Sequence, residues 1–167
     1  ENILLHLKPN VSQYDNNQYF NVNYLNDGDL STFYSTGTIS PQTNVTIDYK
    51  LESIFCVDDL DIYWMNIPSF FVVYIFENNI YYMFDYISQN NEGGNEYYIT
   101  YEDPSKTEIK LCENNIYVDN IVIDIVNNST DYTHYMIRDI QSTGFNVSNR
   151  LIDIQPTKIP INSIPEF

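Results

Sequence analysis

The sequence predicts an all-β fold with one hydrophobic core, and three observations support this. The 167-residue chain contains 16 tyrosines and no alanine, and aromatic residues make up 16% of it. Aromatic and β-branched residues suit the pleated surface of a strand. Short runs alternate apolar with polar residues, and no long stretch keeps the 3.6-residue period of a helix. This length suffices for one buried core and is too short for two domains.

The first part of the chain predicts one short strand among long ordered loops. Residues 1–43 are rich in Asn, Gln, Ser, Thr and Pro, with Ile3-Leu4-Leu5 and Tyr19-Phe20 as apolar anchors. Such polar clusters between short apolar pieces are typical of loops. Regular strands are therefore expected to begin only after Pro41.

Alternation then predicts strands at residues 44–49 and 60–64. In the second strand Leu60, Ile62 and Trp64 share one face, so Trp64 is expected in the core. The opposite face, which carries Asp59 and Asp61, is expected to be solvated.

The clearest hairpin is predicted at Phe70 to Ile87, where two aromatic-rich runs flank Glu77-Asn78-Asn79. Phe70, Phe71 and Tyr81-Tyr82 are expected to be exposed on it. Four further strands are predicted at residues 97–101, 107–112, 120–126 and 135–144. Residues 146–167, with three prolines, are predicted to form an extended tail or linker.

Charge excludes two classes of partner. The chain has 23 acidic residues against 7 Lys and Arg, a net charge of −16. A negative field repels phosphate backbones, so we expect no nucleic-acid partner and no direct binding to anionic membranes. The same field attracts cations, and Ca²⁺ would find many oxygen ligands.

Several motifs, in order, resemble the coagulation factor 5/8 type C (discoidin) family. Residues 26–35 (NDGDLSTFYS) are similar to its DGD-x-x-T-x-W-x-S loop, and residues 45–49 to the strand that follows. Residues 57–86 are similar to its V-x-x-I-x-x-W strand and hairpin. Residues 120–125 and 137–144 resemble its last two strands. In this sequence Tyr34 replaces the Trp, and Asn120 and Asp124 replace two arginines.

The resemblance implies a jelly-roll β-sandwich, galactose-binding-like, over residues 1–145. It also implies a non-catalytic module for recognition or adhesion, secreted or at the cell surface, that binds a glycan or protein partner. Asn-x-Ser/Thr sequons, at Asn10, Asn44, Asn128 and Asn146 among others, fit a secreted chain. The Asn-, Ile- and Tyr-rich composition resembles that of secreted proteins from AT-rich genomes, such as those of apicomplexan parasites.

Many members of the family hold one structural calcium ion. By the resemblance, Asp27, Asp29 and Thr32 would offer side-chain oxygens, Tyr24 and Arg138 backbone carbonyls, and Asp139 a carboxylate. The alternative is that Asp27 and Asp29 simply form Asx-turn hydrogen bonds. The resemblance also places ligands in loops at one end of the sandwich. There the candidate residues for a sugar platform are Tyr14, Tyr19, Tyr34, Tyr132 and His134. The alternative is that these tyrosines pack at the core margin.

Two cysteines, Cys56 and Cys112, leave a single disulfide or two thiols as alternatives. A bridge would add about 4 kcal/mol through the unfolded state. No nucleophile, phosphate-binding or dinucleotide motif is present, so we expect no enzyme. An enzymatic alternative would need His134 or the carboxylates near Asp59 in a pocket. A further alternative is a structural module that packs against other domains or subunits through exposed aromatic residues.

Overall fold

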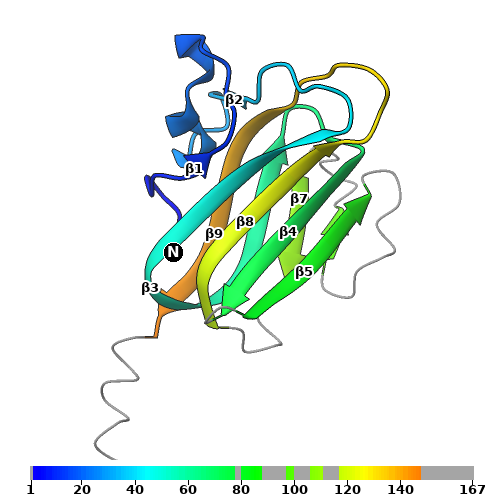
Figure 1. Ribbon diagram of the computed structural model, residues 1–167. Coiled ribbons are helices and arrows are strands. Elements are labelled where there is room, and N and C mark those ends of the chain that lie inside the picture. The colour runs from blue at the N-terminus through cyan, green and yellow to red at the C-terminus, as the bar shows by residue number, and fades with distance from the viewer. Residues whose placement is uncertain (1, 78–79, 88–96, 100–105, 111–116, 148–167) are drawn as a thin grey trace, which may run out of the picture.

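The computed structural model describes residues 2–77, 80–87, 97–99, 106–110 and 117–147 (Figure 1). Within them the chain forms two short 3-10 helices and nine strands. In order these are β1 (Asn10–Val11), η1 (Gln18–Phe20), η2 (Val22–Asn26), β2 (Tyr34–Ser35), β3 (Thr43–Trp64), β4 (Phe70–Glu77), β5 (Ile80–Ile87), β6 (Tyr97–Ile99), β7 (Lys106–Lys110), β8 (Tyr117–Asn127) and β9 (Met136–Asn146).

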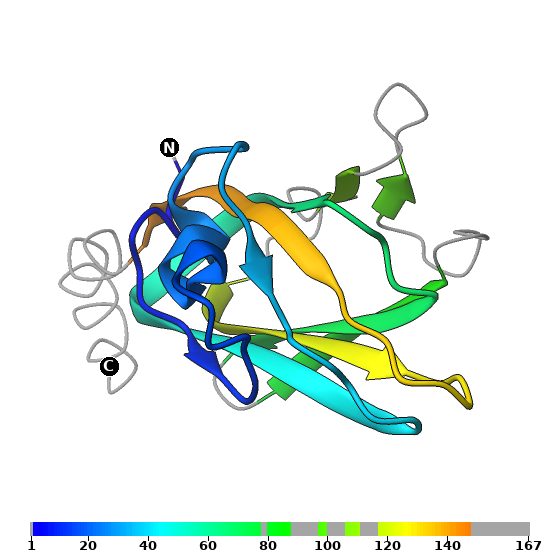
Figure 2. The same ribbon diagram turned by 90° about the horizontal axis from the view of Figure 1, so that it is seen from above.

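Strand β3 connects the two layers of a sandwich. From Thr43 to Lys50 it pairs antiparallel with β8, and from Phe55 to Trp64 with β9. The β3–β8 register shifts between Lys50 and Phe55, where β3 turns from the front layer to the back (Figure 1). The front layer contains β1, the first half of β3, β8, β4 and β5; the back layer contains β2, β9, the second half of β3, β7 and β6. Figure 2 shows the layers from above.

The predicted all-β sandwich is thus confirmed. The separate strands predicted at 44–49 and 60–64 are one continuous strand that bends, because both halves keep ladder hydrogen bonds in different layers. The hairpin β4–β5 and the strands β6 to β9 lie where the alternation predicted them, with ends shifted by a few residues. Residues 148–167 of the predicted 146–167 tail lie outside the described residues, as do residues 100–105 and 111–116.

The core lies between the layers and is built by alternating inward side chains. Trp64 is fully buried, as predicted; its ring centre lies 4.9 Å from that of Phe71, and its indole N–H donates to Thr107 Oγ1 at 2.9 Å. Most other core positions are Val, Ile and Leu, at Val45, Ile47, Leu60, Ile62, Val73, Ile75, Ile121, Ile123, Ile125, Ile137 and Ile140.

The exposure predicted for four residues is wrong. Phe71 is buried in the core, and Phe70 is only partly exposed, because β4 lies between β5 and β8 in the sheet. Asp61 is buried rather than solvated, and Asp59 is half-buried with Oδ1 accepting from the Thr143 hydroxyl at 2.5 Å. Both carboxylates lie in the middle of the back layer, where β7 and β9 flank β3. Tyr81, by contrast, is 56% exposed, as predicted.

The N-terminal segment, residues 2–17, forms a strap across the edge of the sandwich. Leu4 and Leu25 are fully buried, and β1 pairs with Asp48 and Ile47 of β3. The buried Asn26 side chain donates to the carbonyls of Leu4 and Leu7 and accepts from the Tyr49 hydroxyl. None of the helices in the described ranges is long and apolar enough to span a membrane.

Candidate functional site

The DGD segment forms a turn that its own side chains hold together. Asp27 Oδ1 accepts from the Asp29 amide at 3.0 Å, and Asp27 Oδ2 accepts from Thr32 Oγ1 at 2.7 Å. Asp29 Oδ1 accepts from both the amide and the hydroxyl of Ser31, at 2.9 and 2.6 Å. These bonds lower the pKa of the exposed Asp29 carboxyl. The Asx-turn alternative for Asp27 and Asp29 is therefore present in the structure.

Asp139 on β9 joins this turn to the back layer. Gly28, with a φ of 79° that favours glycine, donates its amide to Asp139 Oδ1 at 3.2 Å, and Gln141 Nε2 donates to Oδ2 at 2.7 Å. Burial raises the pKa of the Asp139 carboxyl, and the nearby Asp27 carboxylate adds to that rise. The Asp27 and Asp139 carboxylates thus lie near each other, and a cation between them would reduce their electrostatic repulsion.

The structure brings some of the predicted calcium ligands together. Asp27, Thr32 and Asp139 lie together, and Tyr24 lies on η2 just before the turn. The Asp29 carboxyl points to Ser31 instead. The Arg138 guanidinium donates to the Leu30 carbonyl at 3.2 Å.

The gathered donors are hard oxygens, which fit calcium better than a soft-ligand metal. Over the described part of the chain, no three His, Cys, Asp or Glu side chains form a metal-binding group. A calcium ion would therefore need hydroxyl, carbonyl or water oxygens beside the two carboxylates.

Three loops meet where β3 begins and β8 ends, and we call residues 35–42, 65–69 and 128–135 the rim. The buried Asn127 side chain joins two of them, residues 35–42 and 128–135. Its Nδ2 lies 2.8 Å from the Asp131 carbonyl and 3.1 Å from the Ile39 carbonyl, and its Oδ1 accepts from the amide and hydroxyl of Ser129 at 3.1 and 2.7 Å. Thr133 pairs with Ile39 through the backbone. One amide thus holds two loops of the rim.

Further amides connect the remaining parts of the rim. Gln42 Nε2 donates to the carbonyls of Asn128 and Ser129, both at 3.0 Å. Asn66 accepts from the Met136 amide at 2.7 Å and donates to the His134 carbonyl at 3.0 Å. The rim backbone is therefore fixed before any ligand arrives.

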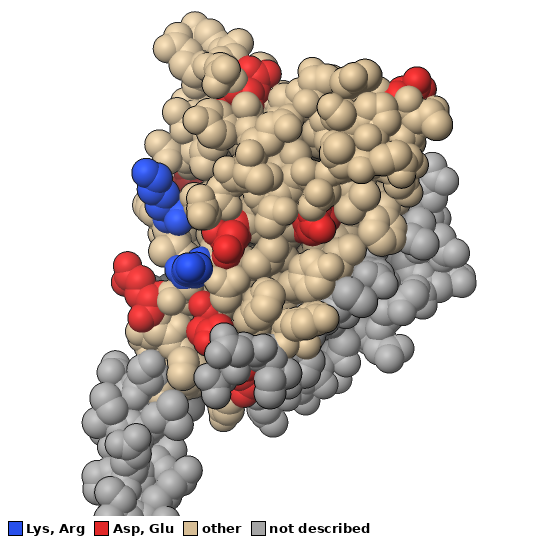
Figure 3. All heavy atoms as spheres, in the orientation of Figure 1, with Lys and Arg blue, Asp and Glu red and all other residues tan. Residues whose placement is uncertain are grey.

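The rim exposes an aromatic ring on an almost uncharged surface. Tyr132 is 69% exposed, Met65 is 44% exposed, and His134 is also exposed. Of the residues in the three loops only Asp131 is an acid, and none is Lys or Arg. In Figure 3 the upper end of the molecule is covered mostly by uncharged side chains. Such a surface suits a neutral ligand.

The five predicted platform residues do not form one surface. Tyr34 is fully buried, its hydroxyl donates to the Gln13 carbonyl at 2.6 Å, and burial raises its pKa far above the ordinary value. Tyr34 is thus a core residue, and its prediction as a ligand contact is wrong. Tyr132 and His134 lie on the rim. Tyr19 lies on η1, and Tyr14 lies on the N-terminal strap, next to Gln13 and Asp15, which bond to residues 35–38 of the rim.

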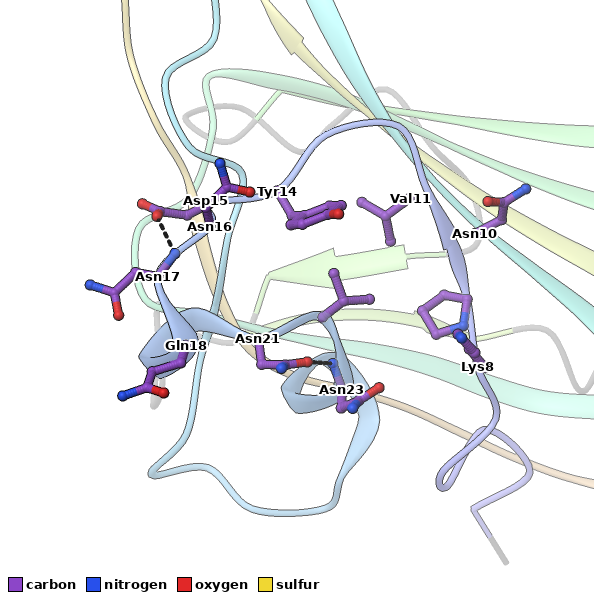
Figure 4. A pocket seen from close by; sticks show the side chains of 12 residues that line it. Lys8, Asn10, Val11, Tyr14, Asp15, Asn16, Asn17, Gln18, Asn21 and Asn23 are labelled. Atoms are coloured by element: carbon purple, nitrogen blue, oxygen red, sulfur yellow. Dashed lines mark hydrogen bonds between the residues drawn. The ribbon is translucent and has the colours of Figure 1, made fainter.

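Tyr14, 54% exposed, borders a pocket between the strap and the two 3-10 helices. The pocket has a volume of about 440 Å³ and is lined by residues 8–11, 14–18 and 21–23 (Figure 4). We call it the Asn-rich pocket. The sequence analysis identified Tyr14 but neither the pocket nor the role of Asn127. The asparagine-rich loops were the only signal in the sequence that could have indicated them.

The remaining candidates have mixed outcomes. Cys56 lies half-buried on β3, and Cys112 lies outside the described residues, so the disulfide stays a prediction. For the enzymatic alternative, Asp59 bonds Thr143 within the sheet, whereas His134 is exposed on the rim.

Comparison with known proteins identifies the fold. No family model matches the sequence, and no curated protein matches it. Solved structures, however, do match the fold of this chain. Chitosan-binding module 2 of a chitosanase/glucanase from Paenibacillus sp. IK-5, in complex with chitotriose, superimposes with a TM-score of 0.62 at 11% identity, over 86% of this chain and 100% of that one.

Two other solved modules give the same result. CpGH89CBM32-4 from Clostridium perfringens has a TM-score of 0.61 at 17% identity, covering 86% of this chain and 98% of its own. The fucose-binding module SpX-3 of Streptococcus pneumoniae has a TM-score of 0.61 at 12% identity, covering 87% and 99%. At such identities the likeness establishes the fold alone.

Proposed function

We propose that this chain is a non-catalytic, extracellular carbohydrate-binding module of the discoidin type, which holds a neutral glycan on the rim. One observation carries the proposal: the exposed Tyr132 ring stands on a loop that the buried Asn127 amide fixes. A ring on an immobile backbone loses little entropy when it stacks on a sugar face. The carbohydrate-binding modules that share the fold support this assignment.

Charge supports a neutral glycan in particular. The rim loops contain one carboxylate and no Lys or Arg, in a chain of net charge −16. Sulfated and sialylated sugars would meet repulsion without a local cation to offset it. Backbone carbonyls, hydroxyls and amides on the rim match the donors and acceptors of sugar hydroxyls.

A glycan array in millimolar calcium, followed by titration calorimetry on the strongest sugar, tests the proposal. Tyr132→Ala is expected to weaken binding about tenfold, or about 1.4 kcal/mol. Tyr19→Ala is the matched control, because Tyr19 is also 69% exposed but lies off the rim. A blank array with folded protein, or an equal loss in both variants, would contradict the proposal.

We also propose that the DGD turn holds a structural calcium ion between Asp27, Thr32 and Asp139. Calcium at a hundred times its Kd would add about 2.7 kcal/mol of stability, which corresponds to about 5–10 °C in Tm at this chain length. Asp139→Asn should abolish the calcium-dependent rise and cost little in its absence, because burial already disfavours the charged carboxylate.

Thermal unfolding in calcium and in chelator measures this effect, and Asp58→Asn, at an exposed position of β3, is the control. The calcium assignment fails if wild type shows no rise in Tm, or if Asp139→Asn keeps the full rise.

One observation favours the alternative of an assembly module. Tyr81 on β5 is 56% exposed. Its ring centre lies 5.6 Å from that of Tyr74 and 5.7 Å from that of Phe76. Such a cluster can bury a partner surface. If this function holds, the wild-type chain should bind a protein partner that Tyr81→Ser no longer binds. Neither of the two proteins should then bind sugar.

A further inference from the structure

Within the described residues, the two layers of the sandwich end in four edge strands, and β5 differs from the other three. Strands β1 and β2 are two residues long and β6 is three, whereas β5 runs for eight residues at the outer side of the front layer (Figure 1). Very short edge strands offer little backbone to another chain, and folded proteins commonly end their sheets in this way. The length of β5 gives it no such protection.

The sequence of β5 also lacks the residues that usually protect an edge. It reads IYYMFDYI, with no lysine, no proline and a single charged residue, Asp85. Its pairing with β4 extends from Glu77 and Ile80 to Phe70 and Ile87 without a register shift, so no β-bulge twists the edge away. Aromatic and β-branched residues with little charge favour pairing with a further strand.

The backbone of β5 presents a regular row of hydrogen-bonding groups on its outer side. Glu77 and Ile80 are directly opposite each other with only two residues between them, so this pair exchanges both of its backbone hydrogen bonds. Successive residues of an antiparallel strand direct their N–H and C=O groups to alternate sides. The groups of Tyr81, Met83 and Asp85 therefore point away from β4. No strand among the described residues pairs with that side.

An apolar cluster lies directly beside this edge. Tyr81 is 56% exposed, and its ring contacts those of Tyr74 and Phe76 on β4. Because Phe71 and Ile75 of β4 are buried in the core, this strand carries apolar side chains on both of its faces. The outer face of an antiparallel sheet that borders water is normally polar. A chain that paired with β5 would cover part of this apolar surface.

From these observations we propose that β5 pairs antiparallel with β5 of a second copy of this chain, so that the two front layers join into one continuous sheet. A two-fold axis perpendicular to the sheet brings the outer faces of both copies to the same side. In the register centred on Met83, Tyr81 of one copy lies opposite Asp85 of the other, and no like charges face each other. The outward groups of the two strands then form about six backbone hydrogen bonds.

This pairing closes on itself. The opposite end of the front layer is β1, which is too short to continue the sheet into a third copy. Because both copies contribute the same edge, the contact is isologous and produces a dimer rather than a fibre. The second copy is therefore a complete partner for this edge.

Charge and area indicate how strong the dimer is. Two chains that each have a net charge of −16 repel one another, and β5, with one acid in eight residues, keeps the local repulsion small. An eight-residue edge is about 27 Å long, which places the contact at the low end of specific interfaces, at about 1,200 Å². We therefore expect a weak, reversible dimer that salt strengthens by screening the repulsion.

The dimer has a consequence for the rim. In each copy the rim loop 65–69 directly precedes Phe70, at one end of β4, and antiparallel pairing reverses the direction of the second copy. The two rims then lie at opposite ends of the dimer. If the proposed glycan binding holds, the dimer links two glycan-bearing surfaces rather than two sites on one surface.

Sedimentation equilibrium without sugar and in a reducing buffer tests the dimer independently of the rim. From about 1 to about 500 µM chain, the weight-average mass should rise from that of one chain towards that of two. The rise should need a higher concentration in about 0.01 M salt than in about 0.15 M salt. Met83→Pro removes an outward N–H and keeps the bonds to β4, and it should weaken the dimer at least about tenfold.

Two further variants locate the contact. Tyr81→Lys places a charge at the exposed edge and should also weaken the dimer, whereas Tyr19→Lys adds the same charge on η1, away from β5, and should leave it unchanged. Met83→Cys should form an intermolecular disulfide on mild oxidation, because the Cα atoms of a hydrogen-bonded pair lie about 5.5 Å apart. Mass spectrometry identifies the cross-linked peptide.

Circular dichroism and urea unfolding show whether each variant is folded. A chain that stays monomeric at every concentration and salt level would overturn the inference and would leave the edge to a strand of another protein. A dimer that folded Met83→Pro and Tyr81→Lys both retain, or one that does not cross-link through residue 83, would overturn it as well.

Discussion

Replacement of Asn127 by alanine tests whether one buried amide fixes the rim. The substitution removes the donor to the carbonyls of Asp131 and Ile39 and the acceptor for the amide and hydroxyl of Ser129. The backbone groups on both loops then lose their partner at once. The loops should become mobile, although the sandwich below them stays folded.

The magnitude follows from the bonds that are lost. Asn127 has two N–H donors and one carbonyl acceptor, which make about four good hydrogen bonds in this site. At a net value of about 0.5–1.5 kcal/mol each, reduced because water reaches the loop surface, the loss is about 2–3 kcal/mol. For a chain of this length that corresponds to about 5–10 °C in Tm.

Urea and thermal unfolding of Asn127→Ala measure this loss, with Asn128→Ala as the control. Asn128 is exposed, and its side chain makes a single surface contact with Ser69, so its replacement should change stability by less than about 0.5 kcal/mol. Sugar affinity at the rim should fall in Asn127→Ala. Equal stabilities of the two variants would refute the role assigned to Asn127.

Two further predictions concern the sandwich itself. Gly144→Ala should cost more than about 2 kcal/mol, because the new Cβ would lie 2.4 Å from the Cys56 carbonyl oxygen within the β3–β9 ladder; an unchanged urea midpoint would show that the strands can separate there. Burial raises the pKa of the Tyr34 and Tyr49 phenols, so the folded state keeps their protons while the unfolded state loses them from about pH 10 upward. The unfolding free energy should therefore be unaffected by these groups below about pH 10 and fall above it, and tyrosinate absorbance should show two phenols that ionise only on unfolding.

Local pattern predicted most of the strands but not how they are arranged. Alternation located the hairpin β4–β5 and the last two strands, since period-two burial is a property of each strand alone. The same alternation missed the continuity of β3 and the burial of Asp61. Both depend on which strands flank β3 in the back layer, and that is a matter of long-range pairing.

The candidate site divides in the same way. The DGD motif located the turn, and composition alone predicts that anionic partners are disfavoured, because a net charge of −16 acts whatever the fold. The family resemblance suggested a sugar platform in the loops but could not tell Tyr34, in the core, from Tyr132, on the rim. Exposure is decided by packing between residues far apart in the chain, and the pairing of Asn127 with Ile39 spans 88 positions. Residue types and local periods thus determined the fold class and the chemistry of the loops. Only the tertiary structure decided which side chains face the solvent, because that depends on contacts no local pattern records.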